Sequence, residues 1–175
     1  MHLGIAAANG IPWMGHAINR QCKVVYLDFE LKQRLAEERI KEIINSQGNE
    51  YFPTKNFMYC PLRGQRRSLE DLALHIQAIR DFEPDMVIVD PFYKLGGEYD
   101  ENDAGSVGLV LDKMETFSER LDCAFVYAHH FSKGNKAETD HIDRASGSGV
   151  FARDPDAILT LTPHEEDYHL VLEAT

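Results

Sequence analysis

Short, nearly continuous apolar runs alternate along this chain with segments in which apolar residues recur every three or four positions. Three of the runs, residues 23–30, 85–90 and 123–130, end in charged or polar residues, and residues 57–60 form a shorter fourth candidate. Strands that are buried on both faces of a parallel sheet have this pattern. The runs therefore predict the strands of a parallel sheet.

Helical periodicity fills the segments between these runs. The apolar residues fall at helical spacing within 31–44, 69–79 and 110–121. Gly48 is an expected stop for the first helix, and Ser68 is an expected N-cap for the second. Alternation of strands and helices is typical of right-handed βαβ units, so we predict an α/β fold with a mostly parallel sheet.

The remaining segments are predicted as a hairpin and loops. Residues 157–162 and 168–172 read as a hairpin or as two consecutive edge strands. Residues 93–105 and 132–149 are polar and are expected to be loops, and a long loop in a compact domain is usually functional or disordered.

The first nine residues predict an apolar helix that ends at Gly10. Neither an N-cap nor a strand precedes this helix. Because a domain rarely starts inside a helix, we expect the chain to be a fragment, or to have lost its start.

Composition narrows the class of protein. A chain of 175 residues, 43% hydrophobic and 27% charged, is expected to form a single domain over residues 1–175. The net charge of −11 excludes binding of nucleic acid through overall positive charge. The three cysteines form no CxxC pair, which argues against a zinc ribbon or a disulfide scaffold. No apolar run is long enough to span a membrane and no signal peptide is recognisable, so a cytoplasmic protein is expected.

Polar side chains gather where the predicted strands end. Asp28 and Glu30, Asp90, and His129 with His130 end three strands whose carboxyl ends meet at one edge of a parallel sheet, where ligands of such folds bind. Each residue alone has a structural explanation, since an acid at a strand end often caps the next helix. Asp90 follows four apolar residues, which is the Walker B pattern of nucleoside triphosphatases, although many buried strands end in Asp.

Several motifs together resemble a known family, the RecA-like ATPases of the plasmid replication helicase RepA group. The resemblance rests on residues 10–15 (GIPWMG), 26–30 (YLDFE), 87–95 (VIVDPFYKL), 100–103 (DEND), 129–134 (HHFSKG), 143–148 (DRASGS) and 154–157 (DPDA). Their order and spacing match along almost the whole chain. The resemblance implies a RecA-like three-layer αβα sandwich, with Mg²⁺ and ATP as cofactors.

The resemblance also implies roles for individual residues. Glu30 corresponds to the catalytic glutamate that orients and activates water. Asp90 corresponds to the Walker B acid associated with Mg²⁺. His130, and less closely His129, corresponds to the polar sensor that contacts the γ-phosphate.

Partners follow from the same resemblance. Lys133, Lys136 and Arg144 lie on or beside a loop that faces the channel of RecA-like rings, so they could contact single-stranded DNA. Acidic residues are interspersed there, and a solvated charged loop is the alternative explanation. A homo-oligomer is expected, a hexamer in the family, that couples ATP hydrolysis to DNA transactions.

One part of the family pattern is absent from the 175 residues. They contain no Gly-Lys-Ser/Thr segment, the end of the Walker A loop that wraps phosphates in P-loop proteins. The resemblance places residues 1–9 on the helix that follows this loop, so the preceding strand and loop would be missing. We then expect weak ATP binding, an unpaired slot in the sheet and self-association.

Two other functions stay open at this point. The chain could be a non-catalytic regulatory or interaction module with a degenerate ATPase fold. It could also be a metal-dependent hydrolase, because Asp28, Glu30, Asp90, His129 and His130 are all suitable ligands. Adjacent histidines on a strand point to opposite faces, which weakens the second option.

Overall fold

A computed structural model describes residues 1–47, 54–64, 73–95, 100, 102–130 and 149–175. The contacts of the chain divide it into two compact units. The first comprises Met1–Glu98 and Asp112–His129, and the second comprises Tyr99–Leu111 and His130–Thr175.

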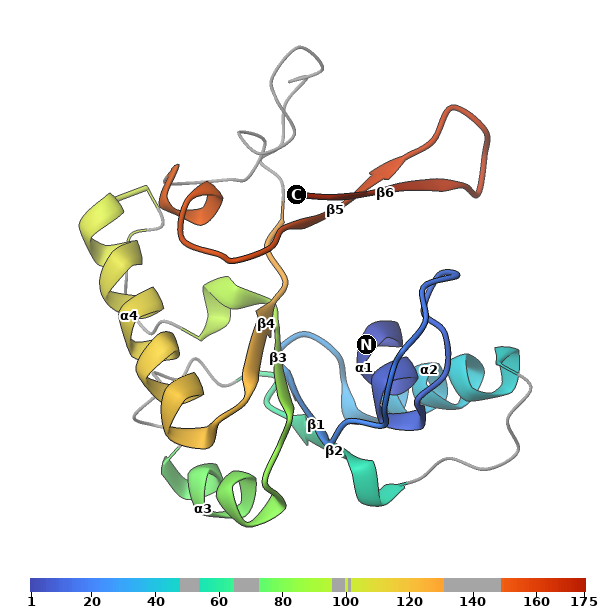
Figure 1. The fold of residues 1–175 in the computed structure, drawn as a ribbon, viewed down its shortest axis with the longest axis horizontal. Helices are drawn as coiled ribbons and strands as arrows, with labels where there is room; N and C mark the ends of the chain where they lie inside the picture. The colour runs from blue at the N-terminus through green and yellow to red at the C-terminus, as the bar shows by residue number, and fades with distance from the viewer. Residues whose placement is uncertain (48–53, 65–72, 96–99, 101, 131–148) are drawn as a thin grey trace. The chain divides into compact units, whose positions relative to one another are not determined.

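The first unit contains a four-stranded parallel sheet in the order β2-β1-β3-β4 (Figure 1). The strands are β1 Val24–Asp28, β2 Phe57–Pro61, β3 Met86–Asp90 and β4 Ala124–Tyr127. All four predicted strands are confirmed, and all three pairings are parallel. The strands are shorter than the apolar runs. Glu30 and the two histidines consequently lie just after the strands rather than within them.

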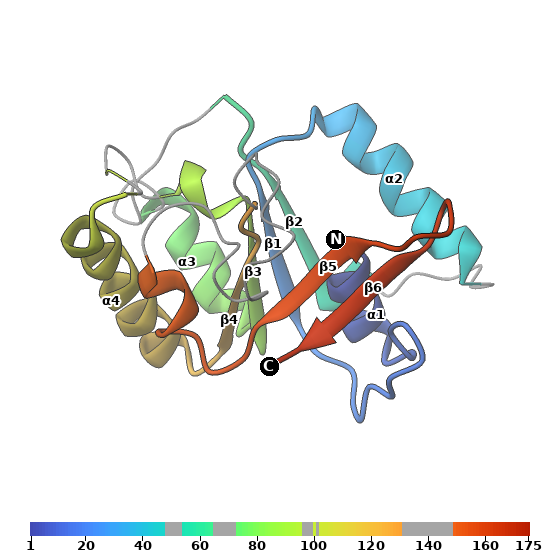
Figure 2. The same cartoon turned by 90° about the horizontal axis from the view of Figure 1, so that it is seen from above.

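Helices cover both faces of this sheet. They are α1 His2–Asn9, α2 Gln33–Ser46, α3 Ala73–Phe82 and α4 Ala104–Leu121. α1 and α2 lie over one face, and α3 with the C-terminal half of α4 lies over the other (Figures 1 and 2). The fold is therefore the α/β, three-layer αβα sandwich expected of a RecA-like domain.

Two helix boundaries show what the apolar pattern missed. α4 begins at Ala104, inside the segment predicted as a loop, because Asp103 caps it: its Oδ2 accepts hydrogen bonds from the Ser106 amide and hydroxyl, both at 2.7 Å. α1 ends as predicted, with Gly10 in the left-handed conformation at φ 67°. The expected cap Ser68 and stop Gly48 lie outside the described residues.

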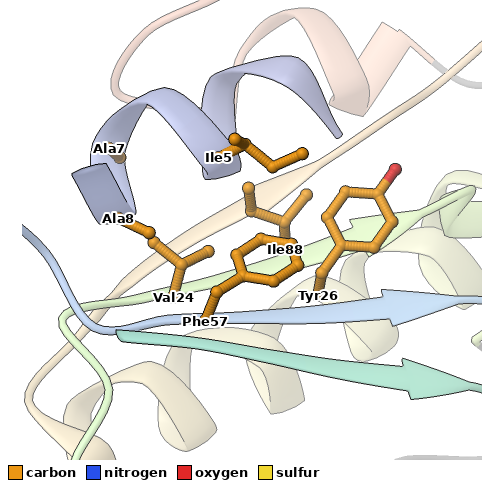
Figure 3. Close-up of a cluster of buried hydrophobic side chains, with 7 residues drawn as sticks. All are labelled: Ile5, Ala7, Ala8, Val24, Tyr26, Phe57 and Ile88. Atoms are coloured by element: carbon orange, nitrogen blue, oxygen red, sulfur yellow. The ribbon is translucent and has the colours of Figure 1, made fainter. Parts of the chain in front are cut away.

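α1 packs directly on the sheet (Figure 3). The cluster combines three residues of α1 with side chains from the first three strands: Ile5, Ala7, Ala8, Val24, Tyr26, Phe57 and Ile88. Gly4 allows the close approach, because a Cβ atom there would lie 2.9 Å from Ile88 Cδ1 and 3.2 Å from Val24 Cγ1. Tyr26 lies at the edge of the cluster, and its hydroxyl points out of it toward the carboxyl ends of the strands (Figure 3).

The sheet is continuous through its described strands. β1 pairs with both β2 and β3, and β3 pairs with β4, in unbroken register. The expected unpaired slot does not lie between these four strands. An additional strand could pair only with the outer edge of β2 or β4.

The second unit carries the predicted hairpin. β5 Leu159–Pro163 pairs antiparallel with β6 Leu170–Ala174. Among the described residues, no helix is long and apolar enough to cross a membrane.

Candidate functional site

Acidic side chains of the first unit meet at the carboxyl edge of the parallel sheet. Asp28 ends β1 and Asp90 ends β3, and the two are register partners across the neighbouring strands. Glu30 follows β1 by two residues, and His129 follows β4 by two. The structure thus places three of the predicted site residues, Glu30, Asp90 and His129, at or just after the carboxyl ends of three neighbouring strands.

Asp28 is buried and its carboxylate is occupied by protein donors. Its Oδ1 accepts hydrogen bonds from the amides of Glu30 and Leu31, both at 2.8 Å. Its Oδ2 accepts the hydroxyl of Tyr59 at 3.1 Å. Only 2% of Asp28 is exposed. This carboxylate fixes the bend after β1, and it therefore holds the backbone from which the Glu30 side chain projects.

Asp90 has different surroundings. The hydroxyl of Tyr26 donates a hydrogen bond to its Oδ2. Burial, together with the hydrogen bond to Asp90, raises the pKa of Tyr26 far above its usual range, so the phenol stays a donor. Within the part of the chain that the structure describes, Asp90 Oδ1 accepts no hydrogen bond. Asp90 is half-buried at the strand end.

Glu30 is exposed and borders the segment that follows β3. Its Oε1 accepts a hydrogen bond from the Tyr93 hydroxyl at 3.4 Å. Tyr93 lies in the 3₁₀ turn Phe92–Lys94, directly after the Asp90–Pro91 peptide. The amide of Phe29 also donates to the Asp90 carbonyl at 2.9 Å, which ties the ends of β1 and β3 together. Glu30 thus lies beside the Asp90 segment with its carboxylate open to solvent.

The two histidines differ in exposure. His129 is half-buried, and its ring meets Phe92 edge-on with 6.4 Å between the centroids. Phe92 is fully buried and its amide donates to the Ala128 carbonyl at 2.9 Å. His130 is exposed. The structure therefore connects His129 to the turn after Asp90, whereas the role predicted for His130 stays a prediction.

The N-terminal end of α1 lies near the same acidic residues. Burial lowers the pKa of the Met1 amino group, and the charges of Asp90 and Asp28 offset part of this lowering. Such electrostatic coupling requires proximity. The amide groups at a helix N-terminus favour anions, so the edge combines an anion-favouring helix end with a carboxylate.

Several predicted residues lie outside the described residues, namely Lys133, Lys136 and Arg144.

The described part of the chain contains no group of three or more His, Cys, Asp or Glu side chains arranged to hold a metal ion. The sequence pattern did not single out Tyr26, Tyr59 or Tyr93. A tyrosine two positions before an acid on the same strand, as in Tyr26 and Asp28, is the signal that places a hydroxyl on the same face of the sheet.

The AAA domain family matches residues 1–136 of the chain. The chain belongs to this family. The match spans all four strands of the parallel sheet and every residue of the acidic edge. No curated protein matches the chain significantly.

AAA domains generally use ATP with Mg²⁺, and the acidic edge fits the cation. Mg²⁺ prefers oxygen ligands and usually takes one or two carboxylates besides phosphates and water. Asp90 offers one carboxylate oxygen that accepts no hydrogen bond from the described residues, while Tyr26 holds the other. Asp28 does not fit this role, because both of its oxygens already accept hydrogen bonds from protein donors.

Proposed function

We propose that this AAA domain is a RecA-like P-loop ATPase domain related to plasmid and phage replication helicases, which couples hydrolysis of Mg²⁺–ATP to a DNA transaction in a ring. The observation that carries the proposal is the asymmetry of the two register partners. Both oxygens of Asp28 accept hydrogen bonds from the protein. Asp90 Oδ1, by contrast, accepts none from the described residues, and the exposed Glu30 lies beside the Asp90 segment.

Asp90 is the residue that would hold Mg²⁺ in this proposal. A cation bound there neutralises charge on the phosphate oxygens. The carboxylate sits on a strand whose preceding residues, Val87 to Val89, are buried, so its position is rigid. The Tyr26 hydrogen bond limits rotation of the carboxylate group.

Glu30 is the general base of the proposal. It would hold a water molecule in line with the γ-phosphate and accept a proton from it. Its backbone amide is fixed by Asp28, while its side chain is exposed and can reach solvent. The polar sensor would be His129, with its ring against Phe92, or His130 at the next position.

The DNA contact and the ring rest on the resemblance alone. Lys133, Lys136 and Arg144 are the residues proposed to touch single-stranded DNA, and a hexamer is the proposed assembly. Replacing the two lysines with alanine should weaken DNA binding and reduce its dependence on salt, because each lost phosphate contact lowers the number of counterions released. Unchanged salt dependence would remove the DNA proposal and leave the ATPase proposal standing.

Titration calorimetry with Mg²⁺–ATP tests the proposal. The chain of residues 1–175 is compared with one extended upstream in its reading frame, and Asp90→Asn in each serves as the control. Binding by the longer chain, weakened by Asp90→Asn, supports the ATPase. If neither chain binds Mg²⁺–ATP, the proposal fails and the non-catalytic interaction module takes its place.

A further inference from the structure

Tyr26 and Asp90 join two neighbouring strands through their side chains. Tyr26 lies in the middle of β1, and its register partner on β3 is Ile88, two residues before Asp90. Both side chains of this hydrogen bond consequently stand on the face of the sheet that α1 covers. The bond runs from the middle of β1 to the carboxyl end of β3.

The ring of Tyr26 is held by packing on all sides. Only 1% of the residue is exposed. It belongs to the cluster formed with Ile5, Phe57 and Ile88, and it stacks on Tyr59 with 6.3 Å between the centroids. A ring fixed in this way cannot follow a moving carboxylate, so the hydroxyl defines a fixed point for Asp90.

The two oxygens of Asp90 thereby become unequal. Oδ2 accepts the Tyr26 hydroxyl, and Oδ1 has no donor among the described residues. A carboxylate that ligates a cation through one oxygen gains from a donor on the other, because the donor fixes the direction of the ligating lone pairs.

We propose that Tyr26 is a positioning residue that holds Asp90 Oδ2 so that Oδ1 faces a divalent cation. This inference rests on the proposed ATPase function and adds to it a residue that acts through Asp90 without touching nucleotide. It predicts that the hydroxyl, rather than the ring, sets the cation affinity of the site.

Tyr26→Phe removes the hydroxyl and keeps the ring, so it separates the two contributions. Tyr59→Phe is the matched control, because it also removes a phenol hydroxyl that donates to an aspartate, Asp28, outside the cation site. Mn²⁺, detected by electron paramagnetic resonance, serves as the probe, with ATP present and with the chain extended upstream.

Tyr26→Phe should bind Mn²⁺ about tenfold more weakly, since outer partners of metal ligands change affinity by about 10–100-fold. Its affinity for ATP without the cation should stay the same, and so should the Mn²⁺ affinity of Tyr59→Phe. Equal Mn²⁺ affinity of Tyr26→Phe and the unmodified protein overturns the inference while leaving the ATPase proposal intact.

A second readout needs neither ATP nor a cation. In the unmodified protein, the Tyr26 hydroxyl proton should exchange slowly enough to be resolved by NMR, and Tyr26→Phe should displace the Asp90 ¹³Cγ resonance. A rapidly exchanging hydroxyl or an unmoved resonance overturns the inference, even if the unmodified protein binds no nucleotide and the proposed function has failed.

Discussion

Asp28 and Asp90 are register partners at the ends of two neighbouring parallel strands, yet among the described residues protein donors occupy both oxygens of Asp28 and only one oxygen of Asp90. Two carboxylates placed side by side in the sheet thus have separate tasks. Asp28 shapes the chain after β1, and Asp90 is left with coordinating capacity.

The first prediction concerns stability. Asp28→Ala leaves three donors without an acceptor, and Asp90→Ala leaves one. Hydrogen bonds to charged groups contribute about 1.5–3 kcal/mol each, and an unsatisfied buried donor costs about 1–3 kcal/mol. Urea denaturation should therefore show a loss of about 3 kcal/mol or more for Asp28→Ala and a smaller loss for Asp90→Ala. A larger loss for Asp90→Ala would contradict the separation of tasks.

Alkaline pH should destabilise the protein through the phenols of Tyr26, which is buried, and Tyr59, which is half-buried. Burial raises the pKa of both Tyr26 and Tyr59 in the folded state above the usual value of 10.0. Their contribution to stability is complete below about pH 10 and is lost as the pH rises above that value, because the unfolded chain releases these protons first. Tyr26→Phe should make the loss of unfolding free energy above about pH 10 shallower. A denaturation series whose slope with pH is the same in both proteins would contradict this expectation.

The sequence predicts the strands and the place of the acidic edge better than it predicts individual hydrogen bonds. The apolar runs predict β1, β3 and β4 well, because residues buried on both faces leave little ambiguity in a parallel sheet. Composition and spacing also place Glu30, Asp90 and His129 at one edge, since carboxyl ends of parallel strands coincide.

The hydrogen bonds within that edge could not be predicted in the same way. Tyr26 reads as one more apolar residue of a buried strand, and only the register of β1 against β3 brings its hydroxyl to Asp90. The start of α4 was missed for a related reason. The cap at Asp103 is a local hydrogen bond, and helical periodicity does not report it.

Asp85 gives the fold a second dependence on pH. Its Oδ1 pairs with Arg20 at 2.8 Å, and its Oδ2 accepts the Lys23 amide at 2.7 Å, so it ties the start of β3 to the segment before β1. These bonds lower the pKa of Asp85 below its usual value of 3.8. The stabilisation that Asp85 provides is complete above about pH 4 and is lost as the pH falls through the lowered pKa of its carboxyl group.

Asp85→Asn should therefore destabilise the protein at pH 7, and the difference from the unmodified protein should shrink below about pH 4. Denaturation at a series of pH values measures this difference in unfolding free energy. Asp112→Asn, a change at an exposed aspartate of α4, is the matched control and should shift stability little at any pH. A difference for Asp85→Asn that grows in acid would contradict the assignment.

Gly4 tests the packing of α1 on the sheet. A side chain there meets Ile88, Val24 and Phe57 at 2.9–3.3 Å. Gly4→Val should therefore lower the unfolding free energy by about 1–3 kcal/mol, the usual cost of overpacking. Gly108→Ala in α4 meets no neighbour within 4 Å and should raise it by up to about 1 kcal/mol through helix propensity. Thermal unfolding of the two variants measures both changes. An undiminished stability of Gly4→Val would show that α1 does not pack as described.

The central claim is that the acidic edge hydrolyses ATP with Glu30 as the base, and Glu30→Gln tests it most directly. The variant keeps the size and the backbone bond to Asp28 but cannot accept the proton. In the chain extended upstream, it should bind Mg²⁺–ATP as tightly as the unmodified protein and hydrolyse it at least about 10²-fold more slowly, the usual contribution of a general base. Hydrolysis at an undiminished rate by Glu30→Gln would contradict the account.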